Sequence, residues 1–309
     1  MKKLLNKIPQ SVYFVYLPLF LFFTFLFFVL TNFLINGWTK QNKVLQPPFV
    51  VLEEAQLPII KTEFVPNISA QGAIIMDADS KVVLYSKNPD LRFSTASTAK
   101  IMTALTAVDY FKPEDILTVQ NATDEGSVLG LTQGERFTFE NLLYAMLLPS
   151  ANDAALAISQ NYPGGEVAFV EKMNAKAKFL NLYNTSYADP AGLVDAGDYT
   201  TPFDLARLAS FAVKNPEIKK IVGTKEIVVS DTYGNVFPLE NLNKLLGVDG
   251  VNGVKTGFTG EAGEVLVTSK LEKGKTIIIV VMGSVDRFSD TEKLLDLVSN
   301  NLSYLSIHP

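Results

Sequence analysis

The stretch STAKIMTALTAVDYF runs from Ser97 to Phe111 and has the apolar spacing of a buried helix. It opens on Ser97 with Lys100 three residues on, and no other Ser in the chain has a Lys at that spacing. If Ser97 opens the helix, both side chains lie one turn apart on the same face, and a neutral Lys100 is within reach of the Ser97 proton. Burial among apolar neighbours such as Ile101 favours the neutral amine. The alternative is a helix-capping serine followed by a solvated lysine.

Two further triplets follow along the chain. Ser150-Ala151-Asn152 lies at a predicted helix break, where a turn with a helix-capping Asn is the alternative interpretation. Lys255-Thr256-Gly257 is the only K-T-G and lies in a predicted strand, where Gly lets a ligand or another backbone come close. An ordinary edge strand with an exposed Lys is the alternative there. Each triplet alone is weak evidence for a site.

The composition excludes several classes of site. The chain has no Cys, and its one His is His308, the second-last residue, so we exclude a Ser-His-Asp triad, a Cys-His dyad and a His-ligated zinc site. An acid–base group in an enzyme with this composition has to be Lys, Asp, Glu or Tyr. The formal net charge of −5 argues against a nucleic-acid-binding protein.

The amino-terminal part of the sequence has the pattern of a membrane anchor. No charged residue occurs from Ile8 to Thr39, and the stretch from Val12 to Ile35 is almost wholly apolar. At about 1.5 Å per residue in a helix, that stretch is long enough to span a bilayer core. The lysines at positions 2, 3 and 7 place the amino end in the cytoplasm. A cleaved signal peptide is the alternative, but the apolar core is too long and FLINGWTK lacks a cleavage site of small residues.

The sequence therefore predicts four segments. They are a basic cytoplasmic N-terminus (1–11), a single-pass transmembrane signal-anchor helix (12–36), a linker (37–66) and a folded domain outside the cytoplasmic membrane (67–309). The linker contains four prolines and no helical period, which is typical of a semi-rigid spacer. The anchor makes the lipid bilayer a partner of the chain.

The order of predicted elements indicates a mixed fold. A hairpin around Asp77 to Ser80 comes first, then helices in FENLLYAMLLPS, NDAALAIS and GEVAFVEKMNAKAKFLNL and one that starts at Thr201. The strands EIVVS, GVKTGFT, EVLVTSK and TIIIVVMGS follow, and Ser289 caps a final helix. Short turns between strands imply antiparallel pairing. We expect an α/β (α+β) fold in which helices flank an antiparallel sheet and a helical subdomain is inserted between two groups of strands.

Taken together and in this order, the three triplets resemble the signature of the penicillin-recognising serine enzymes. The sequence is similar to the low-molecular-weight D-alanyl-D-alanine carboxypeptidases over nearly all of Ser69 to Leu302, including ENLLYAMLLPSANDAALAI and GVKTGFTGEAGEVLV. The resemblance implies a β-lactamase/transpeptidase-like fold and makes residues 67–309 a serine DD-peptidase catalytic domain. It implies removal of the terminal D-alanine from a peptidoglycan stem pentapeptide, with β-lactams as inhibitors and with no metal or other cofactor.

The resemblance also assigns roles. Ser97 is the expected nucleophile, Lys100 its base and Ser150 a relay for the proton to the leaving D-alanine. The residues that match the substrate-binding positions of the family are Asn152, Lys255, Thr256, Gly257 and Phe258. Among these, Lys255 and Thr256 are expected to hold the terminal carboxylate, and the backbone N–H groups of Ser97 and Phe258 to form the oxyanion hole.

The chain departs from the family pattern at a few positions. Asp189 stands where a turn of the family usually has Asn, and Lys244 is only a candidate for the basic residue beside the K-T-G strand. These departures bear on rate and substrate preference more than on reaction type. Three alternatives stay open: a D,D-endopeptidase acting on peptidoglycan cross-links, a β-lactamase, and a non-catalytic wall-binding module. The β-lactamase alternative needs a glutamate in a separate loop, whereas Glu166 and Glu171 fall in a predicted helix.

Overall fold

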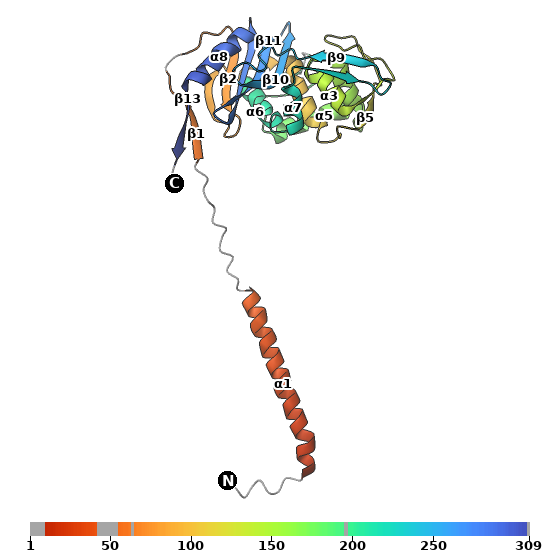
Figure 1. Cartoon of the computed structure of the whole chain (residues 1–309), viewed down its shortest axis with the longest axis vertical. Helices are drawn as coiled ribbons and strands as arrows, with labels where there is room; N and C mark the ends of the chain where they lie inside the picture. Colours follow the sequence, from red (N-terminus) through yellow and green to blue (C-terminus); the bar gives the residue numbers. More distant parts are fainter. Residues whose placement is uncertain (1–9, 42–54, 63–64, 195–196, 308–309) are drawn as a thin grey trace. The chain divides into compact units, whose positions relative to one another are not determined.

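A computed structural model describes residues 10–41, 55–62, 65–194 and 197–307 of the chain. The chain divides into two compact units, Met1–Glu53 with Pro309, and Glu54–His308. The predicted cytoplasmic N-terminus (1–11) falls almost entirely outside the described residues, and so does His308. Figure 1 shows the elements of both units.

The first unit contains one helix, α1 (Gln10–Gln41), with Pro18 inside it. Its described side chains include many exposed Phe and Leu residues between positions 18 and 33. Across the four described ranges of the chain, none of the helices has both the length and the apolarity that crossing a membrane requires. The transmembrane helix predicted over residues 12–36 is therefore not supported by the described residues.

The second unit is built on a five-stranded antiparallel sheet in the order β10-β11-β12-β2-β3. The strands are β2 (Gly72–Asp77), β3 (Val83–Lys87), β10 (Val251–Thr259), β11 (Gly263–Glu272) and β12 (Lys275–Ser284). The predicted hairpin around Asp77 is confirmed by the β2–β3 pairing, and the antiparallel pairing of the last three predicted strands is confirmed as well. The pairing of β12 with β2 places a strand from the end of the second unit beside a strand from its beginning.

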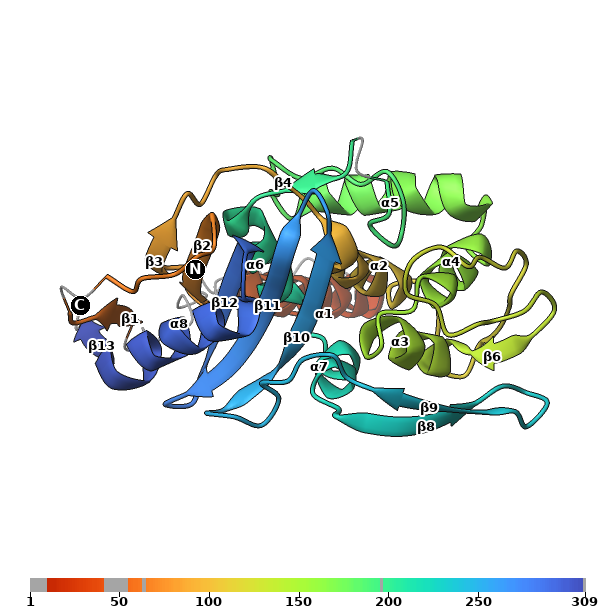
Figure 2. The same cartoon turned by 90° about the horizontal axis from the view of Figure 1, so that it is seen from above.

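Both faces of the sheet are buried, which explains the continuous apolar run in β12. Ile278 and Val280 pack in a cluster with the residues of the inserted helices. Ile277 and Ile279 point to the opposite face, where Leu294 and other residues of α8 (Arg287–Asn301) cover them. Because successive side chains of a strand alternate between faces, an all-apolar strand fits only a sheet with both faces covered. Figure 2 shows α8 along one side of the sheet and α6 (Pro202–Ala212) on the other.

The helical subdomain lies between β3 and β10 along the chain, as predicted. It comprises a short 3-10 helix η2 (Ala96–Thr98), α2 (Ala99–Ala107), α3 (Phe139–Leu147), α4 (Asn152–Gln160), α5 (Gly165–Phe179), α6 (Pro202–Ala212) and α7 (Pro216–Val222). Thr201 caps α6 as predicted, by accepting the N–H of Asp204 at 3.1 Å. The prediction that Ser289 caps the last helix is wrong, because Asp286 is the cap and Ser289 donates its own N–H to it at 3.0 Å.

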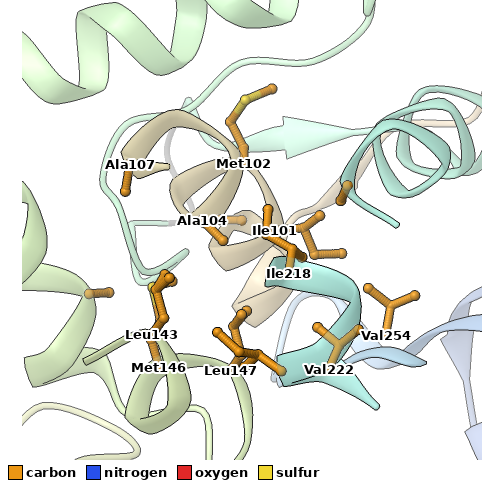
Figure 3. Close-up of a cluster of buried hydrophobic side chains, with 14 of the residues drawn as sticks. Ile101, Met102, Ala104, Ala107, Leu143, Met146, Leu147, Ile218, Val222 and Val254 are labelled. Carbon is orange, nitrogen blue, oxygen red and sulfur yellow. The ribbon is translucent and has the colours of Figure 1, made fainter. Parts of the chain in front are cut away.

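Helix α2 lies at the centre of the helical subdomain. Figure 3 shows apolar side chains of α2 packed against others from α3, α7 and β10; those labelled are Ile101, Met102, Ala104, Ala107, Leu143, Met146, Leu147, Ile218, Val222 and Val254. Almost every side chain of α2 is buried, so polar groups on this helix are removed from water. Any charged side chain carried by α2 has to find its partners inside the protein.

Several short strand pairs were not predicted. They are β4 (Phe93–Ser94) with β7 (Tyr199–Thr200), β5 (Ile116–Thr118) with β6 (Arg136–Thr138), and β8 (Glu226–Ser230) with β9 (Val236–Glu240), of which only β8 was expected. The predicted linker (37–66) is also corrected in part. Residues Ala55–Ile60 form β1, which pairs with β13 (Leu302–Ile307), and Pro58 lies opposite Tyr304. In a two-stranded sheet each strand has a free edge, where the missing N–H of a proline is tolerated.

The carboxylate of Asp290 on α8 ties the start of β2 to the end of β12. It is 2% exposed and accepts hydrogen bonds from the N–H groups of Ser69 (2.9 Å) and Ala70 (2.7 Å) and from the Ser284 hydroxyl (2.6 Å). Its removal leaves the buried donors of Ala70 and Ser284, and the partly buried N–H of Ser69, without their acceptor.

We therefore predict that Asp290→Ala lowers the free energy of unfolding by about 3 kcal/mol. Urea unfolding followed by circular dichroism measures this loss. Asp296→Ala removes an exposed carboxylate from the same helix and should change the stability by less than about 0.5 kcal/mol. Equal losses in the two variants would contradict the structural role of Asp290.

Candidate active site

The S-x-x-K spacing brings Ser97 and Lys100 together as predicted. Ser97 lies in η2 rather than in the first turn of the α-helix, which begins at Ala99. The Lys100 amine donates a hydrogen bond to the Ser97 hydroxyl with an Nζ to Oγ distance of 3.0 Å. Ala96, directly before Ser97, has a φ of 45°, a left-handed conformation that is strained for a residue with a Cβ.

Lys100 is fully buried and has acceptors from three segments of the chain. Besides Ser97, its Nζ donates to the Asn152 side-chain oxygen at 2.6 Å and to the Ala191 carbonyl at 3.0 Å. Burial lowers the pKa of Lys100 to about 7, against the opposing effect of the Asp189 and Asp153 carboxylates. An amine with this pKa is neutral in a large fraction of molecules near neutral pH, so it can accept a proton there.

The S-x-N triplet lies directly ahead of α4. Ser150 is 4% exposed, has a φ of 69°, and its hydroxyl has no hydrogen-bond partner in the part of the chain that the structure describes. Asn152 is the first residue of α4, and its amino group donates to the Glu125 carbonyl at 2.8 Å. Both ends of the Asn152 amide therefore have protein partners, one of which is Lys100.

The K-T-G triplet lies on the edge strand β10, beside η2. Lys255 is 2% exposed and its amine donates to the Thr256 carbonyl at 3.1 Å. Burial lowers the pKa of Lys255 well below its ordinary value, and the nearby positive charges of Lys100 and Arg287 lower it further. A Cβ on Gly257 would lie 3.3 Å from the Ala96 Cβ and 3.4 Å from the Ser97 nitrogen, so glycine permits this close approach. Together, two lysine amines and the Ser97 hydroxyl meet at this edge of the sheet.

Phe258 follows the K-T-G triplet on the same strand, and its side chain is 64% exposed. The role expected of this residue involves its backbone N–H and makes no demand on the aromatic ring. Its neighbour across the strand pair is Glu264 of β11.

Arg287 is a residue of the site that the sequence patterns missed. Its guanidinium donates to the Gly257 carbonyl at 2.9 Å, and its backbone N–H donates to the Glu264 carboxylate at 2.8 Å. The expected basic residue, Lys244, instead has its Nζ 5.6 Å from the centroid of the Phe288 ring. Arg287, and not Lys244, is therefore the basic residue that contacts the K-T-G strand. No local motif marks it, because it follows β12 and reaches the triplet only through the pairing of the strands.

Other kinds of site have less support. Within residues 10–41, 55–62, 65–194 and 197–307, no group of three or more His, Cys, Asp or Glu side chains is arranged to hold a metal ion. Glu166 and Glu171 lie on α5, as the sequence predicted. The chemistry of the site is that of a hydroxyl nucleophile beside a buried amine.

Comparisons with known proteins agree with this geometry. The family model for D-alanyl-D-alanine carboxypeptidase matches residues 59–286, which is more than half of the chain. A D-alanyl-D-alanine carboxypeptidase of Bacillus subtilis is 36% identical over 251 residues, which cover 78% of this chain and 64% of that protein. The chain thus spans slightly less than two thirds of the length of that relative.

Two further matches extend over most of the related protein. A D-alanyl-D-alanine endopeptidase of Escherichia coli is 32% identical over 263 residues, which cover 81% of this chain and 84% of that protein. The crystal structure of a Streptomyces DD-transpeptidase superimposes with a TM-score of 0.72 at 33% identity, and the match covers 76% of this chain and 98% of the transpeptidase. The resemblance seen in the sequence is confirmed: this chain belongs to the D-alanyl-D-alanine carboxypeptidase family of serine peptidases.

Proposed function

We propose that the protein is a serine D-alanyl-D-alanine carboxypeptidase that removes the terminal D-alanine from peptidoglycan stem pentapeptides. The observation that carries this proposal is the buried Lys100 amine, whose Nζ lies 3.0 Å from the Ser97 hydroxyl oxygen. The family match and the names of the relatives support the same activity.

The reaction begins when the Ser97 oxygen attacks the carbonyl carbon between the two terminal D-alanines. Lys100 accepts the hydroxyl proton in this step, and the resulting oxyanion lies between the N–H groups of Ser97 and Phe258. One donor of this kind contributes about 3 kcal/mol to transition-state stabilisation. The C–N bond then breaks, and the proton held by Lys100 passes through the Ser150 hydroxyl to the departing D-alanine nitrogen. Water later hydrolyses the ester on Ser97, which regains its proton. Within the described residues the Ser150 hydroxyl makes no hydrogen bond, so it has the capacity to pair with the departing nitrogen.

Substrate binding uses the groups around the nucleophile. Lys255 and Thr256 would hold the terminal carboxylate, and the Arg287 guanidinium, which is bonded to the Gly257 carbonyl, adds positive charge next to them. Asn152 would bind the substrate amide, which then replaces the Glu125 carbonyl as the partner of its amino group. A β-lactam imitates the same backbone and should acylate Ser97.

A D,D-endopeptidase acting on cross-links is the second candidate function. The specific observation in its favour is the E. coli relative, which is named an endopeptidase and 84% of whose length is covered by the match. Release of D-alanine from a stem pentapeptide, compared with cleavage of a cross-linked stem-peptide dimer, separates the two activities. The β-lactamase and wall-binding alternatives have no relative of that name among these matches.

We also propose that the protein is held at the cell membrane by its amino-terminal segment, with the catalytic domain outside the cytoplasm. The support lies in the sequence, where no charged residue occurs from Ile8 to Thr39 and lysines precede the apolar run. The exposed Phe and Leu side chains of α1 are of the kind that lipid would cover.

The first prediction about function concerns Ser97. The wild-type protein should release D-alanine from a stem pentapeptide and become labelled by fluorescent penicillin, because both reactions acylate the same hydroxyl. Ser97→Ala should lose both activities, whereas Ser159→Ala, on α4 and away from the triplets, should keep both. Full labelling of Ser97→Ala would show that another residue is acylated.

The second prediction concerns pH. Since burial lowers the pKa of Lys100 to about 7, the acylation rate should fall about tenfold for each pH unit below that value as the amine becomes protonated. Lys100→Arg should be inactive because a guanidinium does not give up its proton. Lys172→Arg changes an exposed lysine of α5 and is the matched control. Acylation of normal rate in Lys100→Arg would mean that another group takes the proton.

The third prediction concerns placement. The full-length protein should stay in the membrane fraction through alkaline carbonate washing, because a spanning helix is not held by charge. A chain that begins at Gln41 should be soluble and should still bind penicillin, since no triplet residue precedes Ser97. Release of the full chain by the wash, or a mature amino terminus near Gly37, would contradict the anchor.

A further inference from the structure

A tight turn from Asp189 to Val194 lies directly beside the Lys100 amine. One oxygen of the Asp189 carboxylate accepts the N–H groups of Ala191 (2.6 Å) and Gly192 (2.7 Å). The other oxygen accepts those of Leu193 (2.9 Å) and Val194 (2.7 Å). Asp189 is 7% exposed, so a single buried carboxylate organises the whole turn.

The peptide group between Ala191 and Gly192 links this carboxylate to the lysine. Its carbonyl oxygen accepts the hydrogen bond from Lys100 at 3.0 Å, while its N–H points the opposite way, to Asp189 at 2.7 Å. The carbonyl and the N–H belong to the same planar unit, so the two hydrogen bonds are coupled. A negative charge on the N–H side polarises the amide and makes its oxygen a stronger acceptor.

The position of this peptide group is fixed by its contact with the nucleophile segment. Gly192 has a φ of 78°, and a Cβ at this position would lie 1.9 Å from the Ala96 carbonyl oxygen. Ala96 directly precedes Ser97. The backbone of the turn therefore packs against the segment that carries the nucleophile, which leaves the Ala191 carbonyl little freedom to turn away from Lys100.

We propose that Asp189 is a positioning residue, whose carboxylate holds and polarises the Ala191–Gly192 peptide group so that its carbonyl stabilises the ammonium formed when Lys100 takes the Ser97 proton. This inference rests on the proposed function, in which Lys100 is the base. The positive charge on Lys100 develops during the attack, and a prearranged acceptor aimed at that charge lowers the barrier of the step.

Other charged groups face the same amine. Asp153 acts in the same direction on Lys100, but its carboxylate is bound to the N–H groups of residues 129–131 and of Ala154. Lys255 of β10 lies close enough to Lys100 for the positive charge of either amine to disfavour that of the other. Glu166 on α5 faces Asp189, and burial together with the Asp189 charge raises the pKa of Glu166. Among these described groups, only Asp189 is connected to Lys100 by hydrogen bonds through a single peptide unit.

The test is the pH dependence of penicillin acylation in Asp189→Asn. The Asp189 charge raises the pKa of Lys100, so its removal should move the acid limb of the rate profile to lower pH, by about one unit. The plateau rate should fall roughly tenfold, because the ammonium that forms is less well stabilised. Asp204→Asn is the matched control: this buried carboxylate accepts hydrogen bonds from Asn184 and Thr185, and its loss should leave the acid limb in place.

The outcomes separate this inference from the proposed function. If the wild-type protein is not acylated at all, the proposed function fails. If the wild-type protein is acylated with an acid limb near pH 7 and Asp189→Asn has the same limb, Asp189 is only a structural residue and the inference is overturned. Asp189→Glu keeps the negative charge, so its acid limb should return toward that of the wild type.

A second measurement needs no substitution. The chain contains three Ala-Gly pairs, at 191–192, 196–197 and 262–263, so labelling Ala carbonyl carbons with ¹³C and Gly nitrogens with ¹⁵N leaves three coupled amide signals in an NMR spectrum. The chemical shift of the Gly192 signal should change with pH, with a midpoint near pH 7 that equals the midpoint of the acylation rate profile. The reason is that the Ala191–Gly192 peptide group is hydrogen-bonded to Lys100. A Gly192 signal that is unchanged from pH 5 to about pH 9 would overturn the relay.

Discussion

The burial of the Lys100 amine is the constraint on which the rest of the second unit depends. The amine is removed from water on a helix whose neighbours are apolar, so its three acceptors have to come from the protein: Ser97, Asn152 and Ala191. These acceptors belong to segments far apart in the sequence. The helical subdomain must therefore be fully packed before the amine is satisfied, because a buried ammonium without partners is strongly destabilising.

This arrangement requires backbone strain at the nucleophile and at the S-x-N triplet. Ala96 and Ser150 both have positive φ although both carry a Cβ, with values of 45° and 69°. Each such residue costs on the order of 1–3 kcal/mol. The apolar cluster of α2, α3, α7 and β10 stabilises the fold and holds both conformations in place. One strained residue directly precedes Ser97 and the other is Ser150 itself, which fits the tendency of backbone strain to gather at functional sites.

The sequence predicted what depends on local spacing. It predicted the pairing of Ser97 with Lys100, which a single helical turn determines, and the strands of the sheet, whose apolar runs are long. It did not predict Arg287, which reaches Gly257 only because β10, β11 and β12 pair as they do. The sequence analysis also missed the β1–β13 pair, because no local pattern indicates that two strands separated by most of the chain will pair. The last helix cap was misplaced because Asp286 and Ser289 are both good caps and only geometry decides between them.

The two structural parts of the domain act on Lys100 in opposite directions. The helical subdomain brings Asp189, whose charge favours the protonated amine, while β10 brings Lys255, and two neighbouring amines disfavour each other's positive charge. The protonation states of Lys100 and Lys255 are therefore coupled. In the proposed function, a substrate carboxylate that pairs with Lys255 would favour the charged form of Lys255, and this charge would in turn favour a neutral Lys100. Under that proposal, substrate binding at the sheet edge would shift Lys100 toward the neutral form that can accept the Ser97 proton, because the coupled amines come from the two parts of the domain.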